Sequence, residues 1–477
     1  MKKIIVGLLA ALLLFAPDCF AQKTKIACIG NSITFGHGIN DREHFHYPAQ
    51  LQRYLGSDYE VRNFGVSATT MLLKGDFPYV TTEQYKESLA FLPDIVIIKF
   101  GTNDTKSKNW KYREDFIKDY QAFIDSYRNL SSHPKIILLT PIRCFLPLTD
   151  WDIRGDYVEQ YVRPMIEELA YINKIDIVNM FNVLGDHWDH DLLPDKLHPS
   201  ALGAGDMALK LYQHIKTDGK DIAGQTPDLP FLTDAKPFNF HGYQGYEFTN
   251  QGVACKIVAP KVEAEGKPWI WRARFWGHEP QAEIDLLERG FYVAYCDVAD
   301  MYGNDKAVKR WDDFYKMMVK AGFSKKVALE GMSRGSLIVY NWAAKNAKKV
   351  ACIYADAPVM TLQSWPLGQA SNEGYRKDID KMLQAYGFSS EAEARQWKQN
   401  PMDHAAVMAK AGIPILHVVG DVDETVPYRD NTEIFEAKMK RLGAPIQVIH
   451  KPAIAHHPHS LNNPKPIVDF ILKAMKQ

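Results

Sequence analysis

Short apolar runs alternate with longer amphipathic segments along most of the chain, in two series separated by a stretch without periodicity. Such alternation is typical of parallel sheets in which most strands are followed by a covering helix. In the first series the expected strands are 24–29, 59–64, 94–100, 135–141 and 175–180, and the expected helices are 46–56, 83–91, 111–130, 156–174 and 201–216. In the second series the expected strands are 246–249, 253–259, 268–273, 291–297, 326–331, 350–355, 414–419 and 446–450. The pattern therefore predicts the α/β class in both halves, as two doubly wound domains with ligands at the carboxyl ends of the strands.

The length of 477 residues also favours more than one core. Residues 218–236 contain Gly, Pro and Asp without periodicity, and we interpret them as a linker. The predicted domains are then 22–217 and 237–477. The linker is short for a free tether, so we expect the two domains to be held against each other.

Residues 1–21 have the pattern of a secretion signal, with two lysines, an apolar run and a small-x-small site before Gln22. Cys19 offers a lipoprotein alternative, which is disfavoured because Asp18 precedes it. No other apolar run approaches the roughly 20 residues that span a bilayer. We therefore expect a secreted protein, periplasmic or extracellular, without stable membrane insertion.

The 57 basic and 57 acidic residues cancel, so no overall field attracts nucleic acid or an anionic membrane. Without Cys19 the chain keeps five cysteines, of which Cys28, Cys296 and Cys352 fall inside predicted strands. We interpret them as small core residues rather than a disulfide framework. The sequence carries no signal for an oligomeric state.

The segment GNSIT closes the first predicted strand and places Ser32 where a helix begins. Gly30 permits the sharp turn that lifts this serine to the edge of the sheet, although a serine here is also a common helix cap. Asp195 and His198 stand just before the last helix of the first domain, three residues apart and so on the same side of a turn. We predict that His198 takes the proton of Ser32 and that Asp195 orients the imidazole.

Gly65 follows the second predicted strand and Asn103 follows the third. Their amides, with the Ser32 amide, are the predicted donors to an oxyanion. Taken singly, Gly65 is explained as a turn glycine and Asn103 as a helix cap. In this order, with Ser32 and His198, they resemble the four sequence blocks of the SGNH (GDSL-type) hydrolase family over residues 24–216.

That resemblance implies ester hydrolysis through an acyl-enzyme, without a metal or other cofactor. Members of the family remove acetyl groups from sugars or act as lipases, lysophospholipases and thioesterases. The chain has no long apolar flap suggestive of an acyl-chain channel, which weakly favours sugars. The aromatic residues Phe45, Tyr47, Trp110 and Trp151 fall in or near loops, where they either border the site or pack in the ordinary way.

In the second half, Ser333 lies in the segment GMSRG between an apolar strand and a helix, the context of a nucleophile elbow. The segment GDVDETVP follows the next-to-last strand and resembles the acid loop of prolyl-oligopeptidase-like and esterase members of the α/β-hydrolase fold. That register implies Asp423 as the acid, with Asp421 as the alternative. His456 is the expected base because the family histidine usually follows a small residue, and His459 is its rival.

With His457 between them, His456 and His459 invite a zinc hypothesis. Their sequence neighbours are proline and serine without a carboxylate, so we predict no metal there.

The Arg334 amide is the expected oxyanion donor of the second site, with another around 275–277, where the loop departs from the usual HGGG-type sequence. Arg272 and Arg274 are too costly to bury unpaired, so they either pair with internal carboxylates or open to the pocket. We predict that Arg274 and Trp276 contact substrate.

These features predict a secreted bifunctional carbohydrate esterase. The first domain would remove acetyl groups and the second a related or bulkier acyl ester from one acylated carbohydrate. Two alternatives stay open: the second domain is a non-catalytic binding module, or it is a peptidase. Residues 361–410 interrupt the strands of the second domain and are expected to cap its pocket.

Overall fold

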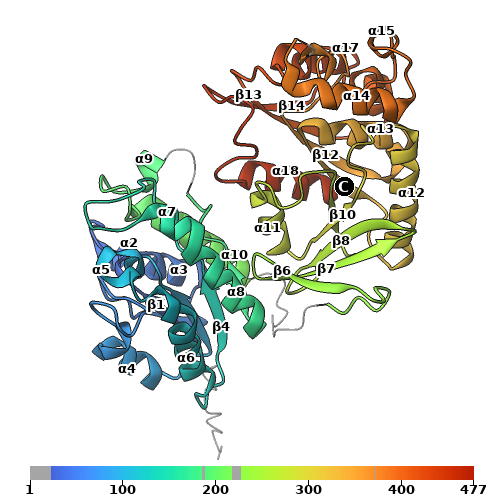
Figure 1. Ribbon diagram of the computed structural model, residues 1–477. Helices are drawn as coiled ribbons and strands as arrows, with labels where there is room; N and C mark the ends of the chain where they lie inside the picture. Colours follow the sequence, from blue (N-terminus) through green and yellow to red (C-terminus); the bar gives the residue numbers. More distant parts are fainter. Residues whose placement is uncertain (1–22, 185–187, 217–226, 370, 477) are drawn as a thin grey trace, which may run out of the picture.

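The computed structural model describes residues 23–184, 188–216, 227–369 and 371–476 (Figure 1). The predicted secretion signal lies outside these ranges. Within them, no helix is both long and apolar enough to cross a membrane.

The first domain is built on five parallel strands in the order β2-β1-β3-β4-β5. The strands are β1 (Thr24–Gly30), β2 (Tyr59–Asn63), β3 (Ile95–Lys99), β4 (Lys135–Leu139) and β5 (Asp176–Val178). The longer helices are α3 (Tyr47–Leu55), α4 (Glu83–Ala90), α6 (Phe116–Arg128), α8 (Arg163–Asn173) and α10 (Ala201–Ile215), and the short ones are α1 (Ser32–Phe35), α2 (Arg42–Phe45), α5 (Ser107–Trp110), α7 (Gly155–Tyr157) and α9 (Trp188–Asp191). This is the predicted doubly wound sheet, in which the strand order reverses between β1 and β3.

Both faces of the central strands of this sheet are buried, which explains their continuous apolar runs. Ile26 and Cys28 of β1 face a cluster that includes side chains of α3 and α10. Ala27 and Ile29, the alternate residues, face a second cluster built on α6 and α8. Ser32, Gly65 and Asn103 follow β1, β2 and β3, so they lie at one edge of this three-layered core.

The second domain has nine strands in the order β14-β13-β12-β11-β9-β10-β8-β7-β6. The strands are β6 (Lys236–Phe240), β7 (Tyr243–Asn250), β8 (Val253–Ala259), β9 (Trp269–Arg272), β10 (Tyr292–Cys296), β11 (Val327–Met332), β12 (Val350–Asp356), β13 (Ile415–Gly420) and β14 (Gln447–Lys451). The helices are α11 (Gln281–Leu287), α12 (Asp305–Lys320), α13 (Ser336–Asn346), α14 (Arg376–Tyr386), α15 (Glu391–Arg395), α16 (Ala405–Ala411), α17 (Thr432–Arg441) and α18 (Lys465–Met475). Strands β9 to β14 are parallel, as predicted, whereas β6, β7 and β8 form an antiparallel edge, so the sheet is mixed.

The sequence did not indicate β6, which begins at the end of the predicted linker. This strand is short, its first two residues are exposed, and it carries Pro237, a residue tolerated at a sheet edge, so it gives only a weak strand signal. Leu229, also within the predicted linker, is buried in the core of the second domain. The described part of residues 218–236 thus packs onto that domain.

The domains meet where α8 and α10 face β6, β7 and α11 (Figure 1). One apolar cluster continues across this contact, from Ile166 and Leu169 of α8 to Tyr243 and Ile284 of the second domain. Lys210 of α10 adds nearly buried ion pairs, at 2.7 Å to Asp285 and 3.3 Å to Glu288. The interface that the sequence could not describe is therefore apolar at its centre and charge-paired beside it.

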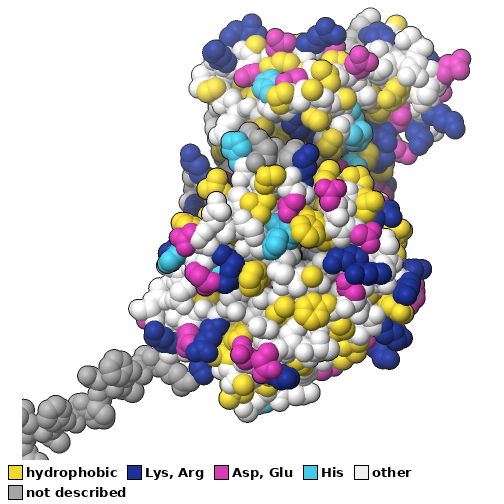
Figure 2. Space-filling model, turned by 90° about the vertical axis from the view of Figure 1, so that its left-hand side faces the viewer, with side chains coloured by type: hydrophobic (Ala, Val, Ile, Leu, Met, Phe, Trp, Pro, Cys, Tyr) yellow, Lys and Arg dark blue, Asp and Glu magenta, His cyan; other side chains and the backbone are white. Residues whose placement is uncertain are grey.

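On the face shown in Figure 2, acidic and basic side chains lie interspersed over both domains rather than in a patch of one sign, in keeping with the balanced composition. The five cysteines among the described residues are buried and free.

Candidate active sites

Ser32 lies directly after β1, as the first residue of α1. The Asn31 side chain accepts a hydrogen bond from the Ile33 amide at 3.2 Å and fixes the turn. His198 Nε2 lies 2.8 Å from Ser32 Oγ, and His198 Nδ1 lies 2.7 Å from Asp195 Oδ2. The structure thus brings these three predicted site residues into one hydrogen-bonded chain, along which a serine proton can pass to the imidazole.

The surroundings of the first site shift the pKa values of Asp195 and His198. Burial raises the pKa of Asp195, but hydrogen bonds from the His198 backbone and side chain and from the Leu197 amide outweigh it and leave the pKa below its usual value. Burial lowers the pKa of His198, and Asp195 opposes this only in part. The imidazole is therefore neutral at neutral pH, as a general base must be.

Gly65 and Asn103 line the same edge of the sheet. A Cβ on Gly65 would lie 2.3 Å from the Phe35 nitrogen, so only glycine allows this loop to lie against α1. The Gly65 amide donates to Asn63 Oδ1 at 2.9 Å, and Asn103 Nδ2 donates to the Thr69 carbonyl at 3.0 Å. Asn103 keeps a second N–H for a ligand. The Gly65 amide, in contrast, could donate to a ligand only by sharing its hydrogen bond to Asn63 or by breaking it.

Sequence reasoning missed His37, whose ring centroid lies 4.8 Å from that of His198. Trp151 lies 6.3 Å from the same imidazole and is 52% exposed, so it borders the site. Tyr47, in contrast, is buried beneath α1, and Trp110 packs on Tyr157. No motif marks His37; only its place one turn beyond the serine would have suggested it.

Lys99 of β3 is fully buried, and its Nζ has no hydrogen-bond partner among the described residues. Burial lowers its pKa from 10.5 to about 7. The residue pairs in register with Gly30, directly before the serine turn, and its charge lowers the pKa of His198. A buried unpaired amine lowers the stability of the fold whenever it is protonated.

We predict that Lys99→Met stabilises the protein, by an amount that shrinks as pH rises. Between pH 7 and 10.5 the unfolded chain binds a proton at Lys99 that the folded chain does not, so wild-type stability rises with pH by about 1.4 kcal/mol per unit. Denaturant unfolding at pH ~7.5 and ~9.5 should therefore show the advantage of the variant falling by roughly 2 kcal/mol. The exposed control Lys86→Met should show no such trend; an advantage of Lys99→Met independent of pH would contradict the prediction.

The second predicted serine follows β11. Ser333 has a φ of 50°, a strained value for a residue with a side chain, and a Cβ on Gly331 would lie 2.9 Å from Ser336 Cα. His456 Nε2 lies 3.0 Å from Ser333 Oγ, and His456 Nδ1 lies 2.7 Å from Asp423 Oδ2. The arrangement is a nucleophile elbow with an acid and a histidine in the chain order of α/β-hydrolases.

Asp421 and His459, the alternative acid and base of the second site, have other partners. Asp421 accepts a hydrogen bond from His450 at 2.7 Å, on the exposed side of β14. His459 is buried and its Nδ1 lies 2.7 Å from Asp356. Ser333 therefore meets Asp423 and His456, the pair preferred from the sequence.

Of the predicted substrate contacts, Arg274 is half-buried and lies 3.6 Å from Asp300. Burial lowers its pKa, and the neighbouring Arg334 adds to the effect. Both arginines line a small cavity next to Gly335 at the elbow. The side chain of Arg334 is held at 2.5 Å by Asp378 of α14, which leaves its amide, beside Ser333 in the chain, as the candidate oxyanion donor.

Arg272 and Trp276 have other surroundings. Arg272 is fully buried, where it contacts Glu283 and lies 3.2 Å from Glu330. The Trp276 ring packs on Phe240 at 5.1 Å, and no contact among the described residues joins it to the second serine or histidine. Arg274 thus faces the second site, and Trp276 supports the β6 edge.

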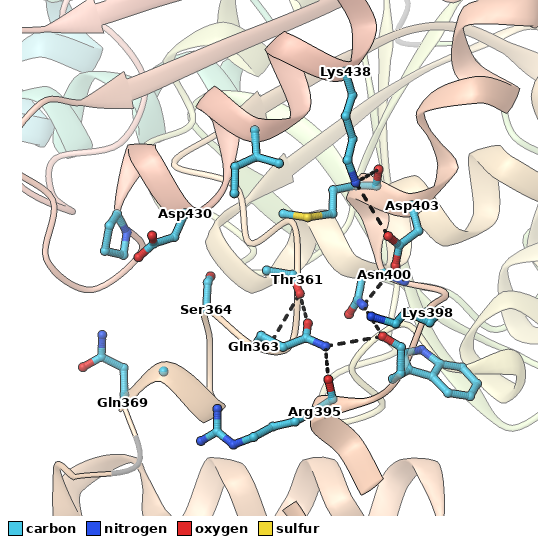
Figure 3. Close-up of a pocket in the computed structure, with 15 residues that line it drawn as sticks. Thr361, Gln363, Ser364, Gln369, Arg395, Lys398, Asn400, Asp403, Asp430 and Lys438 are labelled. Carbon is cyan, nitrogen blue, oxygen red and sulfur yellow. Dashed lines mark hydrogen bonds and ion pairs between the residues drawn. The ribbon is translucent and has the colours of Figure 1, made fainter. Parts of the chain in front are cut away.

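The insertion 361–410 borders a larger cavity of about 720 Å³ (Figure 3). Its walls combine Trp397 with many polar side chains: Thr361, Gln363, Ser364, Gln369, Arg395, Lys398, Asn400, Asp403, Asp430 and Lys438. Gln369 Nε2 donates to the carbonyls of Glu424 and Thr425, at 3.0 and 3.3 Å, so the cavity adjoins the loop that carries Asp423. The second serine and histidine do not line it, so the cavity flanks the site instead of containing it.

Two α/β domains, each with a serine at a strand end and an acid and histidine on later loops, have the architecture of tandem serine-hydrolase domains. Residues 28–205 match the GDSL-like Lipase/Acylhydrolase family, and residues 281–477 match the Prolyl oligopeptidase family. The N-terminal half is thus a GDSL-like lipase/acylhydrolase domain and the C-terminal half a prolyl-oligopeptidase-type α/β-hydrolase domain, which confirms both resemblances.

Over 209 residues the chain is 41% identical to an acetylxylan esterase of Xylanibacter ruminicola; the alignment covers 40% of this chain and 43% of that protein. The chain thus spans less than half the length of this relative. Similar solved structures include an aryl esterase of M. smegmatis (20% identity, 40% of this chain and 98% of that chain, TM-score 0.34) and Porphyromonas gingivalis dipeptidyl peptidase 4 (12% identity, 48% and 35%, TM-score 0.38).

Proposed function

We propose that the protein is a carbohydrate esterase whose first domain removes acetyl groups from a polysaccharide or oligosaccharide. The observation that carries the proposal is the Ser32–His198–Asp195 chain, in a domain 41% identical to an acetylxylan esterase. The exposed Trp151 beside the imidazole offers an apolar face on which a sugar ring can rest.

In the proposed mechanism, Ser32 Oγ attacks the ester carbonyl while its proton moves to His198 Nε2. Asp195 stabilises the imidazolium, and the amides of Gly65, Asn103 and Ser32 bind the oxyanion. Collapse of the intermediate expels the sugar alkoxide, which takes the proton from His198, and leaves an acetyl-serine. Water, deprotonated by His198, then releases acetate and restores the serine.

For the second domain we propose hydrolysis of another acyl ester on the same carbohydrate, which makes the protein bifunctional. The Ser333–His456–Asp423 geometry and the strained elbow support an active site. Arg274 and Arg334 line the cavity at the elbow with Asp300 and Asp378 beside them, and their guanidinium groups favour a substrate with a carboxylate near the ester. Two ester sites on one chain would act on partly processed polymer at raised local concentration.

A peptidase is the second candidate for this domain, because residues 281–477 match the Prolyl oligopeptidase family. A binding module is a third, since a hydrolase fold alone does not imply activity.

The test is a substrate screen with the full chain. We expect acetate release from acetylated xylan through the first site. We also expect cleavage of acylated uronate-containing oligosaccharides, in preference to neutral ones, through the second. Hydrolysis of a proline-containing amide without any sugar ester would contradict the proposal and favour the peptidase.

We further propose that the protein is secreted, periplasmic or extracellular, on the pattern of residues 1–21. A mature N-terminus at Gln22, read by mass spectrometry of exported protein, would support this. An unprocessed chain in the cytoplasm would contradict it.

A further inference from the structure

Three histidines from two distant loops meet beside the second site. His278 follows β9, whereas His457 and His459 follow β14. Each offers a ring nitrogen, and the three nitrogens lie within 4.8 Å of one another. The nearest ring centroids, those of His457 and His459, are 4.7 Å apart, and His278 lies 5.6 and 5.8 Å from them.

His459 is fixed in an orientation suited to a metal ligand. Its Nδ1 donates to Asp356 Oδ1 at 2.7 Å, and Asp356 Oδ2 also accepts from the Ser460 amide at 2.7 Å. The free nitrogen of His459 is therefore Nε2, and a carboxylate behind the imidazole raises its basicity as a ligand. No carboxylate stands near these histidines in the sequence, but Asp356, 103 residues away from His459 in the chain, supplies one in the structure.

The backbone on both sides of the cluster is also anchored. The His278 carbonyl accepts a hydrogen bond from the buried Arg272, and the Pro458 carbonyl accepts one from Lys451 at 2.6 Å. His278 and His457 are exposed, so their rings have room to turn toward a shared ion. A tetrahedral zinc site with Zn–N bonds of about 2.0–2.1 Å brings its nitrogens to about 3.3 Å, a closure that rotation of two surface rings can supply.

His456 is excluded from this set although it stands next to it in the chain. Its Nδ1 is hydrogen-bonded to Asp423 and its Nε2 to Ser333, so neither nitrogen is free. We propose that His278, His457 and His459 form a three-histidine site for a divalent transition-metal ion such as Zn²⁺, beside the second catalytic serine.

Three imidazoles leave the fourth position of a tetrahedral ion open to water or to a ligand oxygen. The ion would also tie the loop that carries His456 to the loop after β9, which holds Arg274. Metal binding should therefore restrict the motion of the two loops that form the second site.

The test uses the full chain, stripped of metal and titrated with Co²⁺ and Zn²⁺. We expect one equivalent of Co²⁺ to give the visible absorption of tetrahedral cobalt, displaced by Zn²⁺, and Zn²⁺ to raise the melting temperature. His278→Ala and His457→Ala, both at exposed positions, should each weaken Zn²⁺ binding at least about tenfold.

His450→Ala serves as the matched control, since His450 is an exposed histidine that contacts Asp421 outside the cluster. It should bind Zn²⁺ as the wild type does, and so should Ser333→Ala, which separates metal binding from esterase activity. Absence of Zn²⁺ binding, or binding that His278→Ala and His457→Ala leave unchanged, would overturn the proposal whether or not the second site is an esterase.

Discussion

The Ser32→Ala variant is expected to lose the acetyl-ester activity of the first site, with its kcat reduced by about 10⁴-fold or more. Without Oγ there is no nucleophile for His198 to activate, and only the oxyanion donors remain. Acetate release from acetylated xylan by the full chain should then fall to the share that Ser333 provides. Ser333→Ala should abolish cleavage of the second ester, and the double variant should release neither acid.

Ser126→Ala is the control for the first site, because Ser126 lies on α6 and its hydroxyl only donates to the Phe123 carbonyl. Its activity should match that of the wild type. If Ser32→Ala kept the wild-type rate on acetylated xylan, the first site would not be the deacetylase. If Ser333→Ala lost no activity on any ester or amide, the second domain would be the binding module.

Much of the first domain could be predicted because its signals are local. The central strands β1, β3 and β4 are apolar runs buried on both faces, and each predicted strand boundary lies within two residues of the observed one. Ser32, Gly65 and Asn103 lie two to four residues beyond the ends of β1, β2 and β3, so the topology alone places them at one edge. Asp195 and His198 are three residues apart, so their contact does not depend on the fold of distant segments.

What the sequence did not reveal depends on contacts between distant segments. The pairing of His459 with Asp356 needs the register of β12 beside the loop after β14, and no local pattern encodes that register. Strand β6 was missed because a five-residue edge strand that contains a proline gives only a weak apolar pattern. His37 stands beside His198 only because the chain returns there after more than 150 residues.

Other contacts between distant segments connect the loop of the second site to the first domain. The loop with His456 runs directly into Asn462, whose carbonyl accepts a hydrogen bond from Asn182 of the first domain at 3.0 Å. Asn463 donates to the Val183 carbonyl at 3.2 Å. His456, the base of the second site, therefore lies on a loop whose far end is hydrogen-bonded to the first domain. The domain interface thus helps to hold this loop in place.

Loss of the buried Arg272 should strongly destabilise the second domain. Arg272 lies between Glu283 and Glu330, all three almost without exposure. Burial raises the pKa of Glu330, and the adjacent Glu283 raises it further, while Arg272 holds it down. Arg272→Met would leave two neighbouring carboxyls without a cation, and we expect the free energy of unfolding to fall by about 3–5 kcal/mol.

The compensating variant separates charge from packing. In Arg272→Met combined with Glu283→Gln and Glu330→Gln, no buried charge is left unpaired, so most of the lost stability should return. Denaturant unfolding followed by tryptophan fluorescence measures each variant, because seven of the ten tryptophans lie in the second domain and Trp269 and Trp271 are buried on the same strand as Arg272. A loss below about 1 kcal/mol in the single variant would mean that solvent or a neighbour compensates the two acids. A triple variant as unstable as the single one would instead mean that the guanidinium contacts to backbone carbonyls, including that of His278, stabilise the domain more than its ion pairs do.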